Sequence, residues 1–438
     1  MTHAGPRVRP APAHIAAVDA GRGLAASYVV LAHVFQILGY KYSLSGWPLL
    51  VDMASAYAHQ AVLFFFLLSG FSIHYASLDR PLDTWAGVRL YYYLRLRRVV
   101  PIFFVVVAGL LAVLWLGKWL ALPGYDEKWQ AWGWRDVIYS LLFLTDRAGT
   151  CGRIATVLPS DPPFWSLSYE MFYYLIYPFF WLLARRFTIG GAVLAGAIAS
   201  VAAIFFDGWQ CHHVFNVLQL YYVWCLGAWV ADVRRHGMRL AWPRWLMYAQ
   251  VFLAAAAGWT VAESAWLRWE EPLWVAALFP LLALSVAGWG EISRRQAMLA
   301  SLAMVLGLAA VLGIASVKAV SHDMAMFCWR VLLLAAIVLL WVWSDGLAWR
   351  QRARGGLIRL FLPLGAVSYA LYLVHYPALA WARAVTEKLH WPVSAALLCL
   401  PPVLALAWGL ELRLQPRAVA WLERLRKGRR GDLVSAPR

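Results

Sequence analysis

Hydrophobic residues in this chain come in long continuous runs, and short polar or basic segments separate the runs. Each run holds about 20 apolar residues, the length that an α-helix needs to cross a hydrocarbon core about 30 Å thick. Only helices and closed barrels satisfy every backbone polar group inside a membrane. We therefore predict an all-α, polytopic helical bundle with about 10–12 transmembrane helices. The twelve candidate spans lie near residues 14–38, 56–76, 99–121, 164–184, 188–206, 214–231, 245–262, 272–289, 297–317, 326–344, 361–382 and 391–410.

The composition agrees with this pattern and excludes a soluble globular protein. Of the 438 residues, 63% are hydrophobic, 14% are charged and 27 are Trp. The longest segment between two runs, 122–163, is expected to be a folded outer loop. Residues 134–144 inside it have the pattern of a short or re-entrant helix, which would change the number of spans by one. We expect one transmembrane domain over 1–438, with cytoplasmic tails at 1–13 and 415–438.

The net charge of +17 is first of all a topology signal. With a cytoplasmic N-terminus, the inner segments hold 28 of the 39 Lys and Arg against 9 acidic residues, whereas the outer segments hold 11 basic against 12 acidic residues. Basic residues concentrate on the cytoplasmic side. We therefore expect both termini on the cytoplasmic side of a bacterial inner membrane, and we expect no nucleic-acid partner. The segment ERLRKGRR (423–430) is then either a stop-transfer anchor or a surface that lies against anionic headgroups. The polar start shows no signal-peptide cleavage site, so the first span is expected to stay in the protein.

The five cysteines show no metal-binding spacing, because no C-x-x-C occurs. The predicted topology places Cys151 and Cys211 outside, where they form either a disulfide or two free thiols. The others, Cys225, Cys328 and Cys399, are expected to be packing residues.

Among the ionisable side chains inside predicted spans, where a charge without a partner is costly, three stand out: His33, Glu170 and His375. Counted at about 1.5 Å per residue from the helix ends, all three fall between the midplane and the outer quarter of the membrane, as in a shared polar cavity. Glu170 is expected to hydrogen-bond an imidazole and orient it, as a carboxylate does beside a catalytic histidine. The structural alternatives are core histidines bonded to backbone carbonyls and a glutamate that sets the register between helices.

Arginines at the inner ends of two spans favour an anionic ligand. Arg22 and His33 are eleven residues apart, which places them on one helix face. Arg95 and Arg98 also share a face, and arginine forks suit phosphate recognition. A coenzyme A thioester, with an anionic head inside and a reactive end at depth, would fit this arrangement. The alternative for Arg95 and Arg98 is a topology anchor without a ligand.

Five segments form an ordered set along the chain: DAGRGLAASYVVLAHVFQ (19–36), HQAVLFFFLLSGFSIHY (59–75), RLRRVVP (95–101), PFWSLSYEMFYYLIYP (163–178) and GAVSYALYLVHYP (365–377). In these segments the chain resembles the membrane-bound acyltransferase 3 family, which includes O-antigen and exopolysaccharide O-acetyltransferases. The resemblance implies that Arg22 and His33 are required for function. It also implies that Arg95 and Arg98 bind the acyl donor from the cytoplasm and that Glu170 belongs to the active-site motif.

The expected activity is O-acylation of a carbohydrate. An acyl group, acetyl in the first place, would pass from cytoplasmic acyl-CoA to a hydroxyl of a cell-envelope polysaccharide or lipid-linked sugar, with His33 as general base or acyl carrier. No metal and no bound cofactor are expected, and the partners are acyl-CoA, the carbohydrate acceptor and membrane lipids. The alternatives are a glycolipid transporter or flippase, although the two halves show no repeat, and an inactive scaffold. The candidate pocket residues are Ser69, Ser166, Ser168, Tyr369 and His375.

Overall fold

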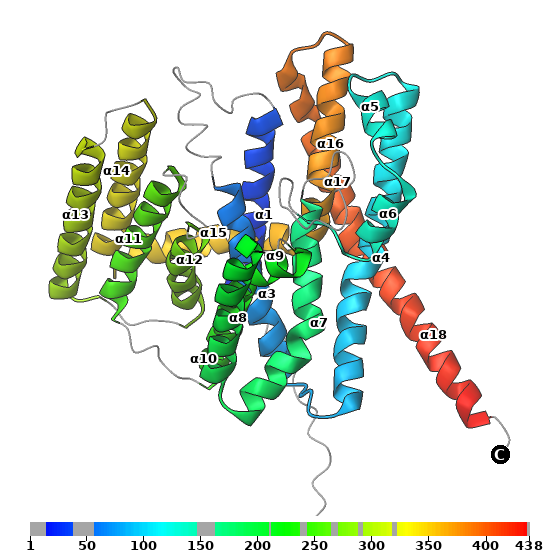
Figure 1. Ribbon diagram of the computed structural model, residues 1–438, viewed down its shortest axis with the longest axis horizontal. Coiled ribbons are helices and arrows are strands. Elements are labelled where there is room, and N and C mark those ends of the chain that lie inside the picture. Colours follow the sequence, from blue (N-terminus) through cyan, green and yellow to red (C-terminus); the bar gives the residue numbers. More distant parts are fainter. Residues whose placement is uncertain are drawn as a thin grey trace, which may run out of the picture.

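The computed structural model describes residues 15–37, 57–146, 163–209, 212–236, 243–263, 270–287, 292–317 and 322–435, and these residues form helices joined by loops (Figure 1). The all-α prediction is confirmed. In chain order the helices are α1 (Ala16–Ile37), α3 (Ala58–Leu78), α4 (Trp85–Trp119), α5 (Tyr125–Gln130), α6 (Trp134–Leu141), α7 (Phe164–Arg186), α8 (Ile189–Trp209), α9 (His213–Gln219), α10 (Tyr221–Arg235), α11 (Arg244–Glu263), α12 (Glu270–Ala287), α13 (Arg294–Val317), α14 (His322–Trp343), α15 (Ala348–Ala366), α16 (Ser368–Lys388), η1 (Val393–Cys399), α17 (Leu400–Gly409), η2 (Leu410–Leu414) and α18 (Gln415–Ser435).

The helices are those of a multi-pass membrane protein. Among the described residues, 6 helices are long and apolar enough to cross a membrane, or up to 7 if the bent pair α14–α15 is one span. Each of the twelve predicted runs falls on a helical segment, but a total of ten to twelve spans stays a prediction. On α7, Leu175, Phe179 and Leu182 are exposed by 61%, 64% and 60%. Apolar residues at this spacing line one helix face, and lipid is the solvent that suits them.

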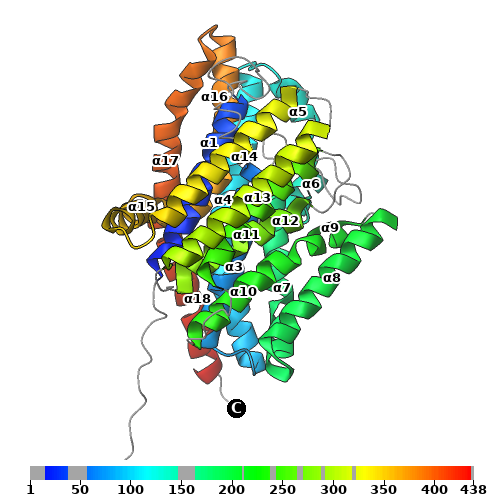
Figure 2. The same ribbon diagram turned by 90° about the vertical axis from the view of Figure 1, so that its left-hand side faces the viewer.

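Among the described residues the helices enclose two large apolar cores and a small third cluster of Val34, Ile37 and Leu379. The larger core joins α1, α3, α4, α7, α10, α12 and α16, and its largest fully buried side chain is Trp224. The smaller core lies among α11, α13 and α14, around Phe252 and Met304. In Figures 1 and 2, α11 to α14 stand together as a separate layer beside the central helices. The helices that carry the candidate site residues, α1, α3, α4, α7 and α16, all contribute to the larger core.

Two glycines let α3 and α10 cross at close range. A Cβ on Gly70 would overlap the Trp224 carbonyl oxygen, and a Cβ on Gly227 would overlap the Leu67 carbonyl oxygen. Backbones approach this closely only where side chains are absent, as at small-residue crossings in membranes. Gly70 follows Ser69, so this crossing also fixes the position of that hydroxyl in the bundle.

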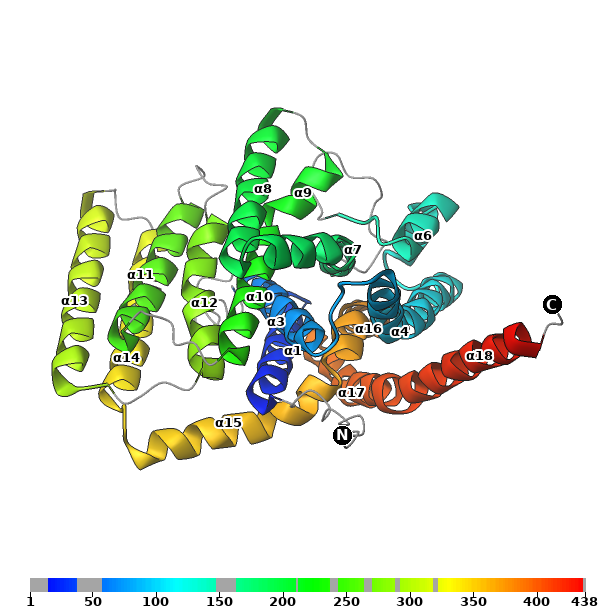
Figure 3. The same ribbon diagram turned by 90° about the horizontal axis from the view of Figure 1, so that it is seen from below.

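Helix α15 corrects the predicted boundaries of the eleventh span and of the inner segment before it. The expected span 361–382 is interrupted at Val367, and the expected loop 345–360 is largely helical. Helix α15 bends by 116° away from the preceding α14 helix and runs along one side of the bundle (Figure 3). Asp345 holds the bend, because it pairs with both Arg244 and Arg350. The sequence pattern did not indicate this break, because Pro363 and its neighbours are as apolar as the residues of a membrane span.

The predicted C-terminal tail begins as part of a long helix. Residues 393–426 form one apolar helical stretch made of η1, α17, η2 and the start of α18. The first turns of α18 pack on α4, whereas its far end projects from the bundle (Figure 1). The predicted tail 415–438 thus begins within this helical stretch, and its cytoplasmic placement stays a prediction. The tail 1–13 lies outside the described residues, as do Cys151 and Cys211.

The described part of the predicted outer loop is anchored through a buried carboxylate. Asp146 accepts hydrogen bonds from Tyr169 at 2.6 Å and Asn216 at 2.8 Å, and it lies 2.9 Å from His213 Nδ1. These contacts tie the end of the loop to α7 and α9. The segment 134–144 contains the eight-residue helix α6, which is far too short to cross a membrane.

Candidate functional site

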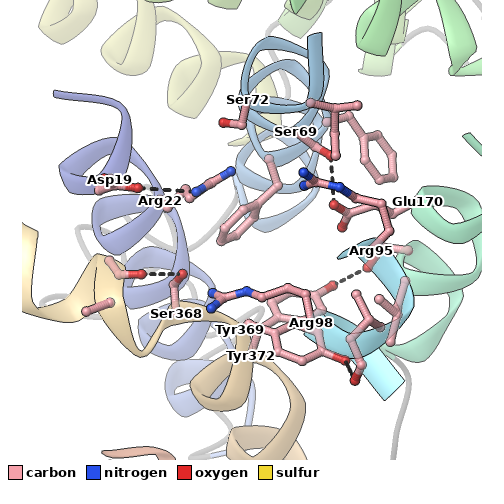
Figure 4. Close-up of a pocket in the computed structure, with 18 of the residues that line it drawn as sticks. Asp19, Arg22, Ser69, Ser72, Arg95, Arg98, Glu170, Ser368, Tyr369 and Tyr372 are labelled. Carbon is pink, nitrogen blue, oxygen red and sulfur yellow. Dashed lines mark hydrogen bonds and ion pairs between the residues drawn. The ribbon is translucent and has the colours of Figure 1, made fainter. Parts of the chain in front are cut away.

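A cavity of about 830 Å³ lies where α1, α3, α4, α7, α15 and α16 meet (Figure 4). This volume is in the range of small-molecule sites. The cavity brings together seven residues singled out from the sequence, although they are spread over five separate segments of the chain. Its polar and charged lining residues are Asp19, Arg22, Ser69, Ser72, Arg95, Arg98, Ser166, Glu170, Tyr174, Ser368, Tyr369 and Tyr372.

Helix α1 contributes an arginine whose charge is partly balanced. Arg22 Nη1 lies 3.2 Å from Asp19 Oδ1, and both side chains are partly exposed. The neighbouring residue, Gly23, has no room for a Cβ because the Phe361 carbonyl lies against it, and Gly365 is likewise closed off by the Asp19 carbonyl. This close crossing of α1 and α15 places Arg22 on the cavity wall.

Helix α4 contributes two arginines from its interior. The helix begins at Trp85, well before the predicted start of the span at 99, so both arginines stand on a formed helix. Arg95 lies over the Tyr91 ring at 5.9 Å from the ring centroid. Within the described part of the chain it makes no hydrogen bond or ion pair, and its Nε is buried without a partner. Arg98 is instead paired with Glu411, with Nη2 2.6 Å from Oε1.

Glu170 faces the arginines in this cavity and does not bond to His33. Its Oε1 accepts hydrogen bonds from Ser69, at 2.7 Å, and from Tyr174. Figure 4 shows Arg95 beside this cluster. The expectation that Glu170 orients the His33 ring is therefore wrong for this structure. Depth counted along each helix is too coarse a guide, because it ignores the rotation of each helix about its axis.

The two serines of the FWSLSYE segment have different surroundings. Ser166 lines the cavity and its Oγ lies 2.7 Å from the Tyr372 hydroxyl. Ser168 points away from the cavity and its Oγ lies 2.7 Å from Thr145 Oγ1. Ser168 is thus excluded from the pocket set, because i and i+2 positions do not share a helix face. Tyr369 lines the cavity and donates to the Val99 carbonyl at 3.0 Å.

His33 pairs with His375, the other histidine singled out from the predicted spans. His33 Nδ1 lies 2.9 Å from His375 Nε2, and the rings are stacked with centroids 5.1 Å apart. His375 Nδ1 lies 3.1 Å from the Leu371 carbonyl. A carbonyl only accepts, so His375 carries its proton on Nδ1 and accepts at Nε2 from His33 Nδ1–H. In this tautomer His33 Nε2 carries the lone pair that can take a proton.

The histidine pair does not line the cavity, but Tyr372 connects the two. Tyr372 is a lining residue, and its ring centroid is 5.8 Å from that of His375. The pair and the cavity are therefore neighbouring parts of one region, and Tyr372 forms the wall between them.

Comparison with known proteins decides the class. The model of the acyltransferase 3 family, described as an acyltransferase domain, matches residues 15–300. The chain belongs to the acyltransferase 3 family. It is therefore an acyltransferase embedded in a membrane, and the cavity and the histidine pair are its candidate active site. No curated protein and no solved structure matches the chain.

The match of this acyltransferase to its family ends before several residues of the site. Tyr369, Tyr372, His375 and Glu411 lie beyond residue 300. Tyr369 and Tyr372 line the cavity and His375 completes the histidine pair all the same, because α16 packs on both α1 and α4. Glu411 lies outside the cavity and pairs with Arg98.

Sequence reasoning missed six polar residues of this acyltransferase site, namely Asp19, Ser72, Tyr174, Ser368, Tyr372 and Glu411. Asp19 and Tyr174 had local signals, since they stand at i−3 from Arg22 and i+4 from Glu170. Tyr372 lies in the late motif but had no neighbour to suggest a role. Glu411 had no usable signal, because it looked like one more charge beside a basic tail.

Proposed function

We propose that this acyltransferase moves an acyl group, acetyl in the first place, from acyl-CoA to a hydroxyl of a cell-envelope polysaccharide or lipid-linked sugar. The observation that carries the proposal is the convergence of Arg22, Arg95 and Arg98 on one cavity. Coenzyme A presents several phosphates, and arginine forks bind phosphate through paired N–H groups.

The three arginines contribute unequally to donor binding. Arg22 forms an ion pair with Asp19 and Arg98 forms one with Glu411, whereas Arg95 forms no ion pair among the described residues, because the neighbouring Glu170 is bonded to Ser69 and Tyr174. A cation outside any ion pair at a partly desolvated site gains most from an incoming anion, because the local dielectric is lower than in water. We assign Arg95 the largest part of the attraction for the phosphates.

His33 serves as the base in the proposed reaction. His33 Nε2 takes the proton from the acceptor hydroxyl as the oxygen forms a bond to the thioester carbonyl carbon. The carbon–sulfur bond then breaks, and the departing CoA thiolate receives that proton. His375 holds the required tautomer of His33, which is the role that a carboxylate has in the serine hydrolase triad. The thioester is already activated, so these steps need no resident cofactor.

Glu170 has a positioning role at the donor cavity in this scheme. It accepts hydrogen bonds from the hydroxyls of Ser69 and Tyr174, and this hydrogen-bonded cluster forms the polar side of the cavity beside Arg95. The acyl end of the donor reaches the histidine pair past Tyr372. The acceptor approaches from the outer side of a bacterial inner membrane, with both termini of the protein in the cytoplasm.

The test is a comparison of envelope carbohydrate from a deletion strain, its parent and strains complemented with wild type or His33→Ala. We expect the ester signals in NMR spectra to disappear on deletion, to return with wild type and to stay absent with the variant. Unchanged ester signals in the deletion strain would remove carbohydrate from the proposal.

A further inference from the structure

Pro101 leaves one carbonyl of α4 without its helical partner. Proline has no N–H, so the carbonyl of Arg97, four residues earlier, loses its hydrogen bond within the helix. Gln415 fills this position: its Nε2 donates to the Arg97 carbonyl at 2.7 Å and to the Arg98 carbonyl at 3.1 Å. The start of α18 is thus docked on the arginine segment of α4.

Glu411 stands one turn earlier, in a π-helical turn. The turn, Leu410–Leu414, joins α17 to α18. Such turns are rare and often mark functional sites, because they change the direction of side chains within a continuous helix. Here the turn buries Glu411, whose side chain is 2% exposed, against the guanidinium of Arg98. A carboxylate this deeply buried needs a charged partner.

Arg98 is held from one side and open on the other. Its side chain is 53% exposed and lines the cavity, whereas Glu411 does not line it. A guanidinium has five N–H donors in a planar fork, so Glu411 can occupy one edge while the rest stays available to a ligand. Glu411 therefore lies behind Arg98 as seen from the cavity.

We infer that Glu411 is a positioning residue that holds Arg98 in the orientation that binds a phosphate of the acyl donor. The inference rests on the proposed function, because it takes acyl-CoA as the ligand of this cavity. Through Glu411 and Gln415, the C-terminal helical stretch, outside the part of the chain that matches the family, becomes a support for donor binding.

The test measures binding of acetyl-CoA to the purified full chain in lipid nanodiscs. For Glu411→Gln we expect affinity to fall about five- to tenfold, the scale of one ordinary hydrogen bond, with turnover at saturating donor little changed. The direction of the change in acetyl-CoA affinity distinguishes the two explanations. Removal of a negative charge beside Arg98 would strengthen phosphate binding if only net charge mattered, so weaker binding reports lost orientation.

Matched variants keep the result interpretable. Glu423→Gln removes an acidic partner of the neighbouring Arg97, but Glu423 is 49% exposed and lies outside the cavity, so affinity should stay at the wild-type value. Glu411→Asp keeps the charge and shortens the side chain, and should show a milder loss. In the Arg98→Gln background, Glu411→Gln should change affinity no further, because it acts through Arg98.

Two outcomes separate the inference from the proposed function. If wild type binds acetyl-CoA and both Glu411 variants bind it equally well or better, Glu411 does not position Arg98. If wild type itself does not bind acetyl-CoA, the donor assignment fails and the role of Glu411 fails with it.

Discussion

His33 and His375 are 342 positions apart in the chain and form a direct hydrogen bond, Nδ1 to Nε2, at 2.9 Å. The Leu371 carbonyl fixes the tautomer of His375 and so that of His33. A carboxylate was expected in this role, and an imidazole held by a backbone carbonyl takes its place. Each ring therefore has a different part in the chemistry.

The histidine pair predicts a graded loss of activity. His33→Ala should lower turnover by about 10² to 10⁴, the usual contribution of a general base. His375→Gln should lose less than His375→Leu, because an amide oxygen can still accept from His33 Nδ1–H. Turnover in membranes with equal amounts of protein is the measurement. Equal activity of the Gln and Leu variants would exclude the tautomer-holding role.

Arg95 should be the arginine most sensitive to substitution. Arg95→Gln should weaken acetyl-CoA binding about 10- to 100-fold, because a phosphate loses a charge-assisted contact of about 1.5–3 kcal/mol. Arg22→Gln should cost less, because Asp19 already offsets its charge. Arg95→Lys keeps the charge for membrane insertion but loses the fork, so its affinity should be intermediate. Wild-type affinity in Arg95→Gln would show that this residue is a topology anchor.

The Arg98–Glu411 pair should be coupled in stability as well as in binding. Arg98→Gln leaves a buried carboxylate without its partner and should destabilise the protein by about 1–3 kcal/mol. Adding Glu411→Gln should restore most of this loss, since the remaining groups are neutral. Thermal unfolding of the purified single and double variants checks the cycle. Additive losses would mean that the two side chains do not interact.

The α1–α15 crossing predicts a strong effect of a single methyl group. Gly23→Ala places a Cβ against the Phe361 carbonyl, so the helices must separate, at about 1–3 kcal/mol or with failure to assemble. Gly109→Ala is the control, because that position has nothing within 4 Å and alanine favours a helix. Detergent-extracted yield and melting temperature should fall for the first variant and hold for the second.

The charge distribution predicts the orientation in the membrane. A fluorescent reporter at the C-terminus should be active, because segments rich in basic residues stay in the cytoplasm. Cys151 should react with a membrane-impermeant thiol reagent once the outer membrane is permeabilised, while the inner membrane is still intact. Activity of a C-terminal phosphatase reporter, which works only outside the cytoplasm, would contradict the predicted orientation. Arg352→Glu with Arg354→Glu tests the same principle by weakening the inner charge excess.

The sequence by itself determined the helical class, the membrane environment and most of the charged residues of the cavity. Run length and charge follow from local composition, and residue spacing along one helix defines a face, so spacing and composition were enough to select Arg22, Arg95, Arg98 and Glu170. Tertiary structure alone decided which faces meet. It placed Glu170 against Ser69 and Tyr174, His33 against His375, and Glu411 behind Arg98. Helix rotation, glycine crossings and the break at Val367 set these contacts, and each depends on packing between segments that are far apart in the chain.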